Sequence, residues 1–304
     1  MSENTLKSGS MFPPELVTEM FNAVNGHSAI AKLAVQKPLP FNGEKSFIFD
    51  LEGEASLVGE SEAKPAGKAT MNPVVVTPLK FIYQARVSDE FINAAREVQI
   101  NYLKTFGEGF SRIIARGLDL AAFHGVNPAT NISSAKLTDN NFDGVIENIV
   151  TYDASTPDDN LDAAIQLLTA AQKSATGIAM SPAFGAALSK VKVNGVAQYP
   201  EFRFGGQPEK FAGYTVDVNG TVSKCKSDED VDIYTDHAII GDFQNLFRWG
   251  YAKNMPLEII EYGDPDGAGR DLKRYNEVLL RTEAYIGWGI MDKTAFAIIN
   301  KKNT

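Results

Sequence analysis

Residues 54–87, EASLVGESEAKPAGKATMNPVVVTPLKFIYQARV, lead directly into a long helical pattern that ends in residues 121–128, AAFHGVNP. Two extended apolar segments flank a polar tip, and residues 60–70 of that tip hold two Lys, one Pro and one Gly. A two-stranded hairpin is at best marginally stable in water, because it cannot bury a core by itself. The hairpin therefore needs a partner, and we expect that partner to be a second copy of the same chain.

The segments beside the tip alternate apolar and polar residues, as half-buried strands do. In the first strand, Phe47, Phe49 and Leu51 share one face. The return strand is predicted as one continuous segment, with alternate residues of 75–87 on one face. Pro78 cannot donate a ladder hydrogen bond, so this strand is predicted to lie at a sheet edge or to pair irregularly.

A helix is predicted from Ser88 to Phe123, with Ser88 as the N-cap and Gly125 as the stop. Its apolar residues recur every three or four positions, so one stripe faces a core. The helix would be about 50 Å long at 1.5 Å per residue. Gly107 and Gly109 each cost about 1 kcal/mol relative to Ala, which predicts a kink or a close backbone contact there.

Beyond this helix the pattern is that of an α/β segment followed by long strands. Helices are predicted at 157–171 and 182–191, and strands at 177–181, 214–219, 231–243, 251–262 and 275–285, with a strand and a turn in 286–300. Residues 1–43 are predicted to be an arm with little intrinsic structure, in which Pro13 and Pro14 open a short helix that continues from Glu15 and stops at Gly26.

Composition limits the possible functions. The chain has 304 residues, 44% of them apolar, and no run approaches the roughly 18 apolar residues of a membrane span. Its net charge of −9 disfavours a dedicated nucleic-acid binder, but a protein that only surrounds nucleic acid gains from not adhering to it. Cys225 is the only cysteine and has acidic neighbours in 227–232, so we expect an inert thiol.

No active site stands out, and we expect neither catalysis nor a cofactor. His27, His124 and His237 lie far apart without metal-ligand spacing, and His124 is predicted to cap the carbonyls at the end of its helix. GDPDG at 263–267 lacks the later ligands of a calcium loop and is predicted to be a turn between two strands. Phosphate-binding and nucleophile-elbow motifs are absent from the sequence.

Four segments, taken together, resemble the major capsid proteins of tailed bacteriophages with the HK97-type fold. Residues 55–91 are similar to the family's E-loop leading into the spine helix, and 112–131 (RIIARGLDLAAFHGVNPATN) to the end of that helix. Residues 239–259 (IIGDFQNLFRWGYAKNMPLEI) and 276–299 (NEVLLRTEAYIGWGIMDKTAFAII) resemble the segments that carry the long strands and the C-terminal run.

The resemblance implies an α+β, HK97-type capsid fold in six segments. These are an N-terminal arm (1–43), an extended E-loop hairpin (44–87), a peripheral domain with the spine helix (88–157), an axial domain (158–245), the long strands of the peripheral domain (246–285) and a C-terminal return to the axial domain (286–304).

It also implies a function. The expected protein is a virion component, assembled in the host cytoplasm as pentamers and hexamers of an icosahedral shell that encloses double-stranded DNA without sequence-specific binding. A portal and a separate scaffolding protein are expected partners. Because only a short segment precedes Phe47, where many relatives carry a scaffolding segment, we expect the scaffold to be a separate protein or to be absent. The alternatives are an encapsulin-type compartment shell and, more remotely, a soluble α/β enzyme or binding protein.

Six residues are singled out. Phe81 and Tyr83 are predicted to contact a neighbouring subunit, and Gly107 and Gly109 to be a hinge in the spine helix. Lys64 and Lys68 lie where some relatives form a Lys–Asn isopeptide crosslink. Because exposed lysines are ordinary in loop tips, we expect contact with a neighbour rather than a covalent bond.

Overall fold

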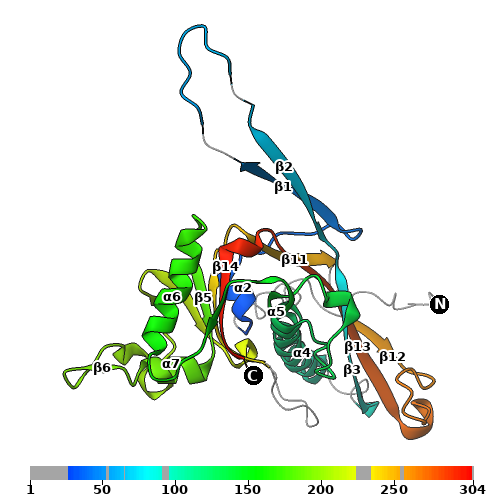
Figure 1. Cartoon of the computed structure of the whole chain (residues 1–304). Helices are drawn as coiled ribbons and strands as arrows, with labels where there is room; N and C mark the ends of the chain where they lie inside the picture. Colours follow the sequence, from blue (N-terminus) through cyan, green and yellow to red (C-terminus); the bar gives the residue numbers. More distant parts are fainter. Residues whose placement is uncertain are drawn as a thin grey trace.

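The computed structural model describes residues 27–52, 55–64, 66–90, 96–223, 234–253 and 257–302. The predicted arm helix within 15–26, Cys225 and the acidic cluster at 227–232 lie outside these residues. The described chain is α+β and contains two main sheets, a long helix and a projecting hairpin (Figure 1).

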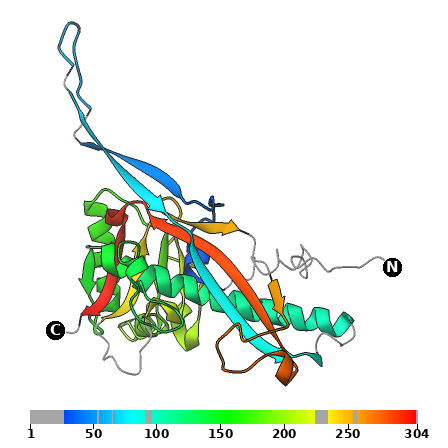
Figure 2. The ribbon, with the colours of Figure 1, turned by 90° about the vertical axis from the view of Figure 1, so that its right-hand side faces the viewer.

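The hairpin consists of β1 (Glu44–Glu52) and β2 (Lys68–Val76). The two strands are antiparallel over their whole length, from Glu44 opposite Val76 to Glu52 opposite Lys68. They form a sheet of their own that reaches away from the rest of the molecule (Figures 1 and 2). The predicted hairpin is therefore confirmed.

The prediction of one continuous return strand is wrong. β2 stops at Val76, and β3 (Leu79–Ser88) begins after Thr77 and Pro78 and pairs with β13 instead of β1. Pro78 marks the break because it has no N–H to donate. Among the described residues β3 has one neighbouring strand, so the predicted edge position is confirmed.

The spine helix is α4 (Arg96–His124), which has 29 residues and is about 43 Å long. Leu103, Phe110, Ile114 and Leu118 lie on its buried side, at the spacing of an apolar helical stripe. Helical structure continues without a break through Gly107 and Gly109. Figure 2 shows α4 crossing the body beneath β3 and β13.

The second sheet is built around β13 (Glu277–Ile290), a strand of 14 residues. β3 pairs along one side of it, while β11 (Phe247–Lys253) and β12 (Leu257–Ile260) share the other side. The predicted single strand over 251–262 is therefore two strands, and β13 is longer than the predicted 275–285. The loop with GDPDG joins β12 to β13, which confirms the predicted turn.

A six-stranded mixed sheet forms the other half of the body. Its strands, in order, are β4 (Ile149–Thr151), β14 (Phe296–Lys302), β10 (Tyr234–Gly241), β5 (Gly177–Met180), β9 (Tyr214–Val218) and β8 (Lys210–Phe211). The helices α6 (Pro157–Ala170) and α7 (Pro182–Leu188) pack on it. Both begin at the residue predicted, which in each case is a Pro, a residue that suits the first turn of a helix.

Shorter elements connect these parts. They are α2 (Ala29–Leu33), α5 (Phe142–Val145), the small hairpin of β6 (Lys192–Val193) and β7 (Val196–Ala197), and the 3₁₀ turns η1 (Ala135–Leu137), η2 (Pro200–Gly205), η3 (Gly220–Val222), η4 (Lys273–Tyr275) and η5 (Lys293–Ala295).

Two buried apolar clusters support the body. One joins α2, α4, α5 and the inner side chains of β11 and β13, and it includes Trp249 and Trp288. The other lies between the six-stranded sheet and the helices α6 and α7. Residues of β1 belong to neither cluster, so the hairpin has no core of its own in the described chain.

Candidate inter-subunit surfaces and buried polar sites

The hairpin carries apolar side chains that face solvent. Phe47 on β1 and Met71 and Val75 on β2 are each more than half exposed. In the tip, the Leu57 side chain is fully exposed. Contiguous exposed apolar surface on a soluble protein marks an interaction site or an aggregation liability. The hairpin is therefore the first candidate for an inter-subunit surface.

The two predicted contact lysines belong to this hairpin. Lys64 is exposed in the tip, and Lys68 is the first residue of β2. The structure places them on the same projecting element, which is the geometry that a contact with a neighbour requires. Their role in such a contact remains a prediction.

Phe81 and Tyr83, in contrast, already have partners within the chain. The ring of Phe81 lies 6.4 Å from that of Trp288, and the ring of Tyr83 lies 6.2 Å from that of Phe106 on α4. Both side chains are half-buried against the core that contains α4. Ile82 points to the opposite side of β3 and is 53% exposed, so it is the more open of these side chains.

A groove of about 660 Å³ runs beside Phe81 and Tyr83, between β3, α4 and the segment 127–137. Its lining is mainly apolar, and Ile113 on α4 is 43% exposed there. The exposed parts of Phe81 and Tyr83 therefore face a concave surface rather than open solvent.

The hinge candidates Gly107 and Gly109 lie within the continuous part of α4. A Cβ placed on Gly109 would meet nothing within 4 Å, so a close backbone contact does not explain this glycine. At Gly117 a Cβ would make ordinary van der Waals contacts, 3.4 Å from Pro128 and 3.5 Å from the Phe81 ring. Bending at Gly107 and Gly109 remains a prediction.

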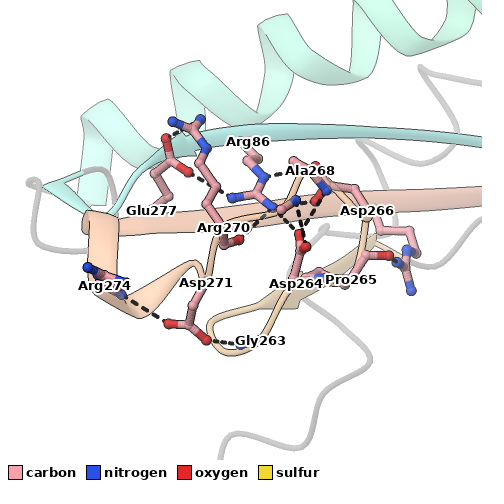
Figure 3. A network of polar contacts seen from close by, with 12 residues as sticks. Arg86, Gly263, Asp264, Pro265, Asp266, Ala268, Arg270, Asp271, Arg274 and Glu277 are labelled. Atoms are coloured by element: carbon pink, nitrogen blue, oxygen red, sulfur yellow. Dashed lines mark hydrogen bonds and ion pairs between the residues drawn. The ribbon is translucent and has the colours of Figure 1, made fainter.

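Arg86, near the end of β3, organises the loop between β12 and β13 (Figure 3). Its guanidinium donates to both carboxylate oxygens of Asp266, to Asp264 at 2.6 Å and to Glu277 at 3.1 Å. Glu277 also accepts a 2.7 Å bond from Arg270, whose backbone carbonyl accepts from Arg86. Several charges in one network hold a loop better than isolated surface pairs do.

The network shifts the pKa values of Asp266 and Arg86. Hydrogen bonds from Arg86 hold the pKa of the Asp266 carboxyl well below its usual range, and the same bonds raise the pKa of Arg86. Asp264 stiffens the loop further by accepting from the backbone N–H groups of Ala268 and Gly269. The sequence correctly indicated a turn here, but it gave no signal that Arg86, 178 residues before Asp264, would be its anchor.

A pair of glycines lets the arm and the base of the hairpin approach the long sheet closely. Gly250 and Gly287 are opposite each other on β11 and β13, next to the buried pair Trp249 and Trp288. A Cβ on Gly250 would lie 1.7 Å from the carbonyl oxygen of Lys37, and one on Gly287 would lie 3.2 Å from that of Thr77. Gly250 therefore excludes any larger side chain, while a side chain at Gly287 would require its neighbours to shift.

Asp119, near the C-terminal end of α4, ties the arm to the body. Its buried carboxylate accepts from the hydroxyls of Ser28 and Thr221 and from the backbone N–H groups of Ala29 and Ile30, the first residues of α2. Burial raises the pKa of Asp119 to about 6, against the effect of these hydrogen bonds. This site was not predicted, because its partners are up to 102 residues away in the chain.

The prediction that His124 caps the carbonyls of its own helix is wrong. Its Nδ1 lies 2.9 Å from Asp143 Oδ2, and its Nε2 lies 3.0 Å from the carbonyl oxygen of Thr221. His237 is buried and stacks on Tyr152 at 3.6 Å, and His27 is exposed at the start of the described chain. The three histidines thus remain separate, as their spacing indicated, but His124 has acidic neighbours that its spacing did not reveal.

The hairpin, the long helix α4 and the two sheets define the HK97-type capsid fold. A structure from Mycobacterium phage Ogopogo has 31% sequence identity and a TM-score of 0.74, and the match covers 90% of this chain and 92% of that one. A structure from Gordonia phage Cozz has 25% identity and a TM-score of 0.73, with 90% and 86% of the chains covered. The fold also matches the capsid of a native GTA particle at 12% identity and a TM-score of 0.62, covering 90% of each chain.

The chain belongs to the phage capsid family, whose model matches residues 8–301. No curated protein matches the sequence significantly. In the described part of the chain, none of the helices is long and apolar enough to cross a membrane.

Proposed function

We propose that this protein is a major capsid protein that assembles as pentamers and hexamers into an icosahedral shell around double-stranded DNA. The observation that carries the proposal is the hairpin of β1 and β2, which is paired along nine residues of each strand, although none of its described side chains belongs to either buried cluster. Such a ribbon gains its missing burial on a neighbouring subunit. The family match supports the same assignment.

The charge of the chain fits a container better than a DNA reader. A net charge of −9, with Lys and Arg dispersed along the sequence, does not favour phosphate contacts, so the enclosed DNA is held by the shell without sequence-specific binding. The protein is a structural component of the virion rather than an enzyme, assembles in the host cytoplasm, and works with a portal and a separate scaffolding protein.

The predicted division of the chain is retained as part of this proposal. Segment 158–245 supplies most of an axial domain that corresponds to the six-stranded sheet, and 286–304 returns to it through β14. Segment 246–285 supplies the long strands, although β13 continues past it to Ile290. The arm is segment 1–43, the E-loop is 44–87, and 88–157 contains the spine helix.

The encapsulin-type shell is the second candidate, because it shares the fold. The 31% identity to a phage structure over 90% of the chain favours the capsid. Electron microscopy of the protein, expressed alone and with its phage gene neighbours, tests the choice. When the protein is expressed with its phage gene neighbours, we expect icosahedral heads that contain DNA. Small cargo-filled shells would support the encapsulin. A small uniform oligomer would overturn both assignments.

The hinge is tested in the same particles. If α4 bends at Gly107 and Gly109 when the shell expands, then replacing both by Ala stiffens the helix and reduces the fraction of fully expanded heads. A Gly117→Ala variant is the comparison, because it makes the same substitution at another position of α4, where a Cβ would make only ordinary contacts with Pro128 and Phe81. Normal expansion of the Gly107→Ala, Gly109→Ala double variant would contradict the hinge.

A further inference from the structure

Three side chains from separate elements converge where α4 ends. His124 is the last residue of α4, Asp143 lies on α5, and Asp236 lies on β10. Their ligand atoms all lie within 4.8 Å of one another. The side chains of His124 and Asp236 are 0% and 1% exposed, and that of Asp143 is 22% exposed, so solvent reaches the cluster from the Asp143 side.

The hydrogen bonds of His124 determine which nitrogen faces the carboxylates. Nε2 lies 3.0 Å from the carbonyl oxygen of Thr221, which can only accept, so Nε2 carries a proton. Nδ1 then points at Asp143 Oδ2 at 2.9 Å and Asp236 Oδ2 at 3.4 Å. A histidine that ligates a metal through one nitrogen commonly donates its other N–H to a backbone carbonyl, as His124 does.

The spacing of these atoms also suits a metal ion. Zinc lies about 2.0–2.2 Å from nitrogen and oxygen ligands, which places neighbouring ligands about 3.0 Å apart at right angles and about 3.4 Å apart in a tetrahedron. The two observed separations, 2.9 and 3.4 Å, fall in this range. In addition, Asp143 Oδ1 is buried and has no hydrogen-bond partner among the described residues, so a second carboxylate oxygen is available.

We propose that His124, Asp143 and Asp236 form a structural binding site for a divalent first-row transition cation, with Zn²⁺ as the best-fitting ion. One imidazole and two carboxylates favour Zn²⁺ over Mg²⁺ and Ca²⁺, which prefer oxygen ligands alone. The ion joins the end of α4 to α5 and to the six-stranded sheet through β10. It thereby fixes the spine helix to the half of the subunit that contains α6 and α7.

Metal binding is measured on the full-length chain after dialysis against Zn²⁺ and then against metal-free buffer. We expect about one Zn²⁺ per chain by mass spectrometry, and a calorimetric titration with ZnCl₂ that an excess of Mg²⁺ does not suppress. Asp143→Asn keeps the size of the side chain and should weaken Zn²⁺ binding more than tenfold. Asp139→Asn, at an exposed aspartate nearby, is the matched control and should bind as the wild type does.

The competing arrangement is a doubly protonated His124 paired with the carboxylates. It predicts no stoichiometric Zn²⁺, and nitrogen chemical shifts that show protons on both ring nitrogens at pH 8 with Zn²⁺ present; either result overturns the metal site. Equal Zn²⁺ affinity of wild type and Asp143→Asn also overturns it. Should Asp143→Asn misfold by circular dichroism, Co²⁺ replaces the variant as the test. Wild-type protein must then bind one Co²⁺ with visible absorption bands that Zn²⁺ abolishes.

Discussion

The hairpin tip and the loop between β12 and β13 lie at opposite ends of the molecule, and they are held in different ways (Figure 2). Both are rich in Gly, Pro and charged residues. The loop is fixed by Arg86, which bonds Asp264, Asp266 and Glu277. In the described tip, the corresponding contact is local, from the Gly59 N–H to the Glu62 carboxylate. Similar compositions thus give a loop that a distant part of its own chain fixes and a tip whose described residues have no comparable long-range anchor.

The largest expected effect comes from removing the tip. Replacing residues 53–67 by Asn-Gly joins Glu52 to Lys68 through a two-residue turn, which their pairing opposite each other allows. We expect the yield of assembled particles in sucrose gradients to fall more than tenfold. The melting temperature of the unassembled subunit should change by no more than about 2 °C, because the tip supports no core.

That result would sharpen the contrast between the two ends. Subunits that melt far below the wild type would show that the tip stabilises its own chain. Normal particle yield would show that the neighbour does not need it.

The next largest effect is a difference in unfolding free energy between substitutions on the two faces of β3, at Phe81 and at Ile82. Phe81→Ala should destabilise the subunit by about 2 kcal/mol in urea unfolding, because the half-buried ring packs on Trp288 and beside Gly117. Ile82→Ala removes a side chain that is 53% exposed and should leave the unfolding free energy within about 0.5 kcal/mol. If Phe81→Ala were neutral for folding and harmful only to assembly, Phe81 would act mainly at the subunit contact.

A smaller effect is expected at the fixed loop. Arg86→Gln should lower the melting temperature of the subunit by roughly 5 °C. Arg86→Lys should not restore it, because an ammonium cannot reproduce the bidentate bond to Asp266. An Arg86→Gln subunit as stable as the wild type would mean that the loop does not need its anchor.

The difference in melting temperature between the wild type and Arg86→Gln should depend on pH through the carboxyl group of Asp266. Arg86 depresses the pKa of Asp266, so the stabilisation is complete above the unfolded pKa of about 4 and is lost as the pH falls through the lower, folded pKa. Thermal melts should therefore show a constant gap between wild type and Arg86→Gln from pH 8 to pH 5, and a narrowing gap below about pH 4. A gap that widens on acidification would contradict the assignment.

The smallest effect is expected at the tip lysines. Lys64→Ala combined with Lys68→Ala should leave a single monomer-sized band on a denaturing gel of mature heads, identical to the wild type. A ladder of larger bands in the wild type that the double variant lacks would show a covalent crosslink. Lys45→Ala, on β1, controls for the loss of a hairpin charge.

Structural features that depend on residues close together in the sequence were predicted well. The alternation at Phe47 and Phe49, the periodic stripe of α4 and the Pro starts of α6 and α7 all follow from local geometry. The HK97-type fold followed from four motifs in order rather than from any one of them. The break at Pro78 was only partly predicted, because a proline indicates lost pairing but not which strand the chain joins next.

The polar sites could not be predicted in this way. Arg86, Asp119 and His124 each contact residues about 90 to 190 positions away, so no local spacing reveals them. The facing pairs Trp249–Trp288 and Gly250–Gly287 are visible in the sequence only as two Trp-Gly neighbours, in opposite order. Their meaning depends on the register between β11 and β13.

At the junction of Thr77 and Pro78, a small rotation of the hairpin produces a large displacement of its far end. Its strands have nine residues each, about 30 Å at 3.4 Å per residue, so a 10° rotation at the junction displaces their far end by about 5 Å. The Val76 side chain, at the end of β2, packs closely over Gly289, where a Cβ would lie 2.8 Å from it. A shell whose local curvature differs between neighbouring positions could therefore keep one rigid subunit body and adjust the reach of each hairpin through a few backbone torsions.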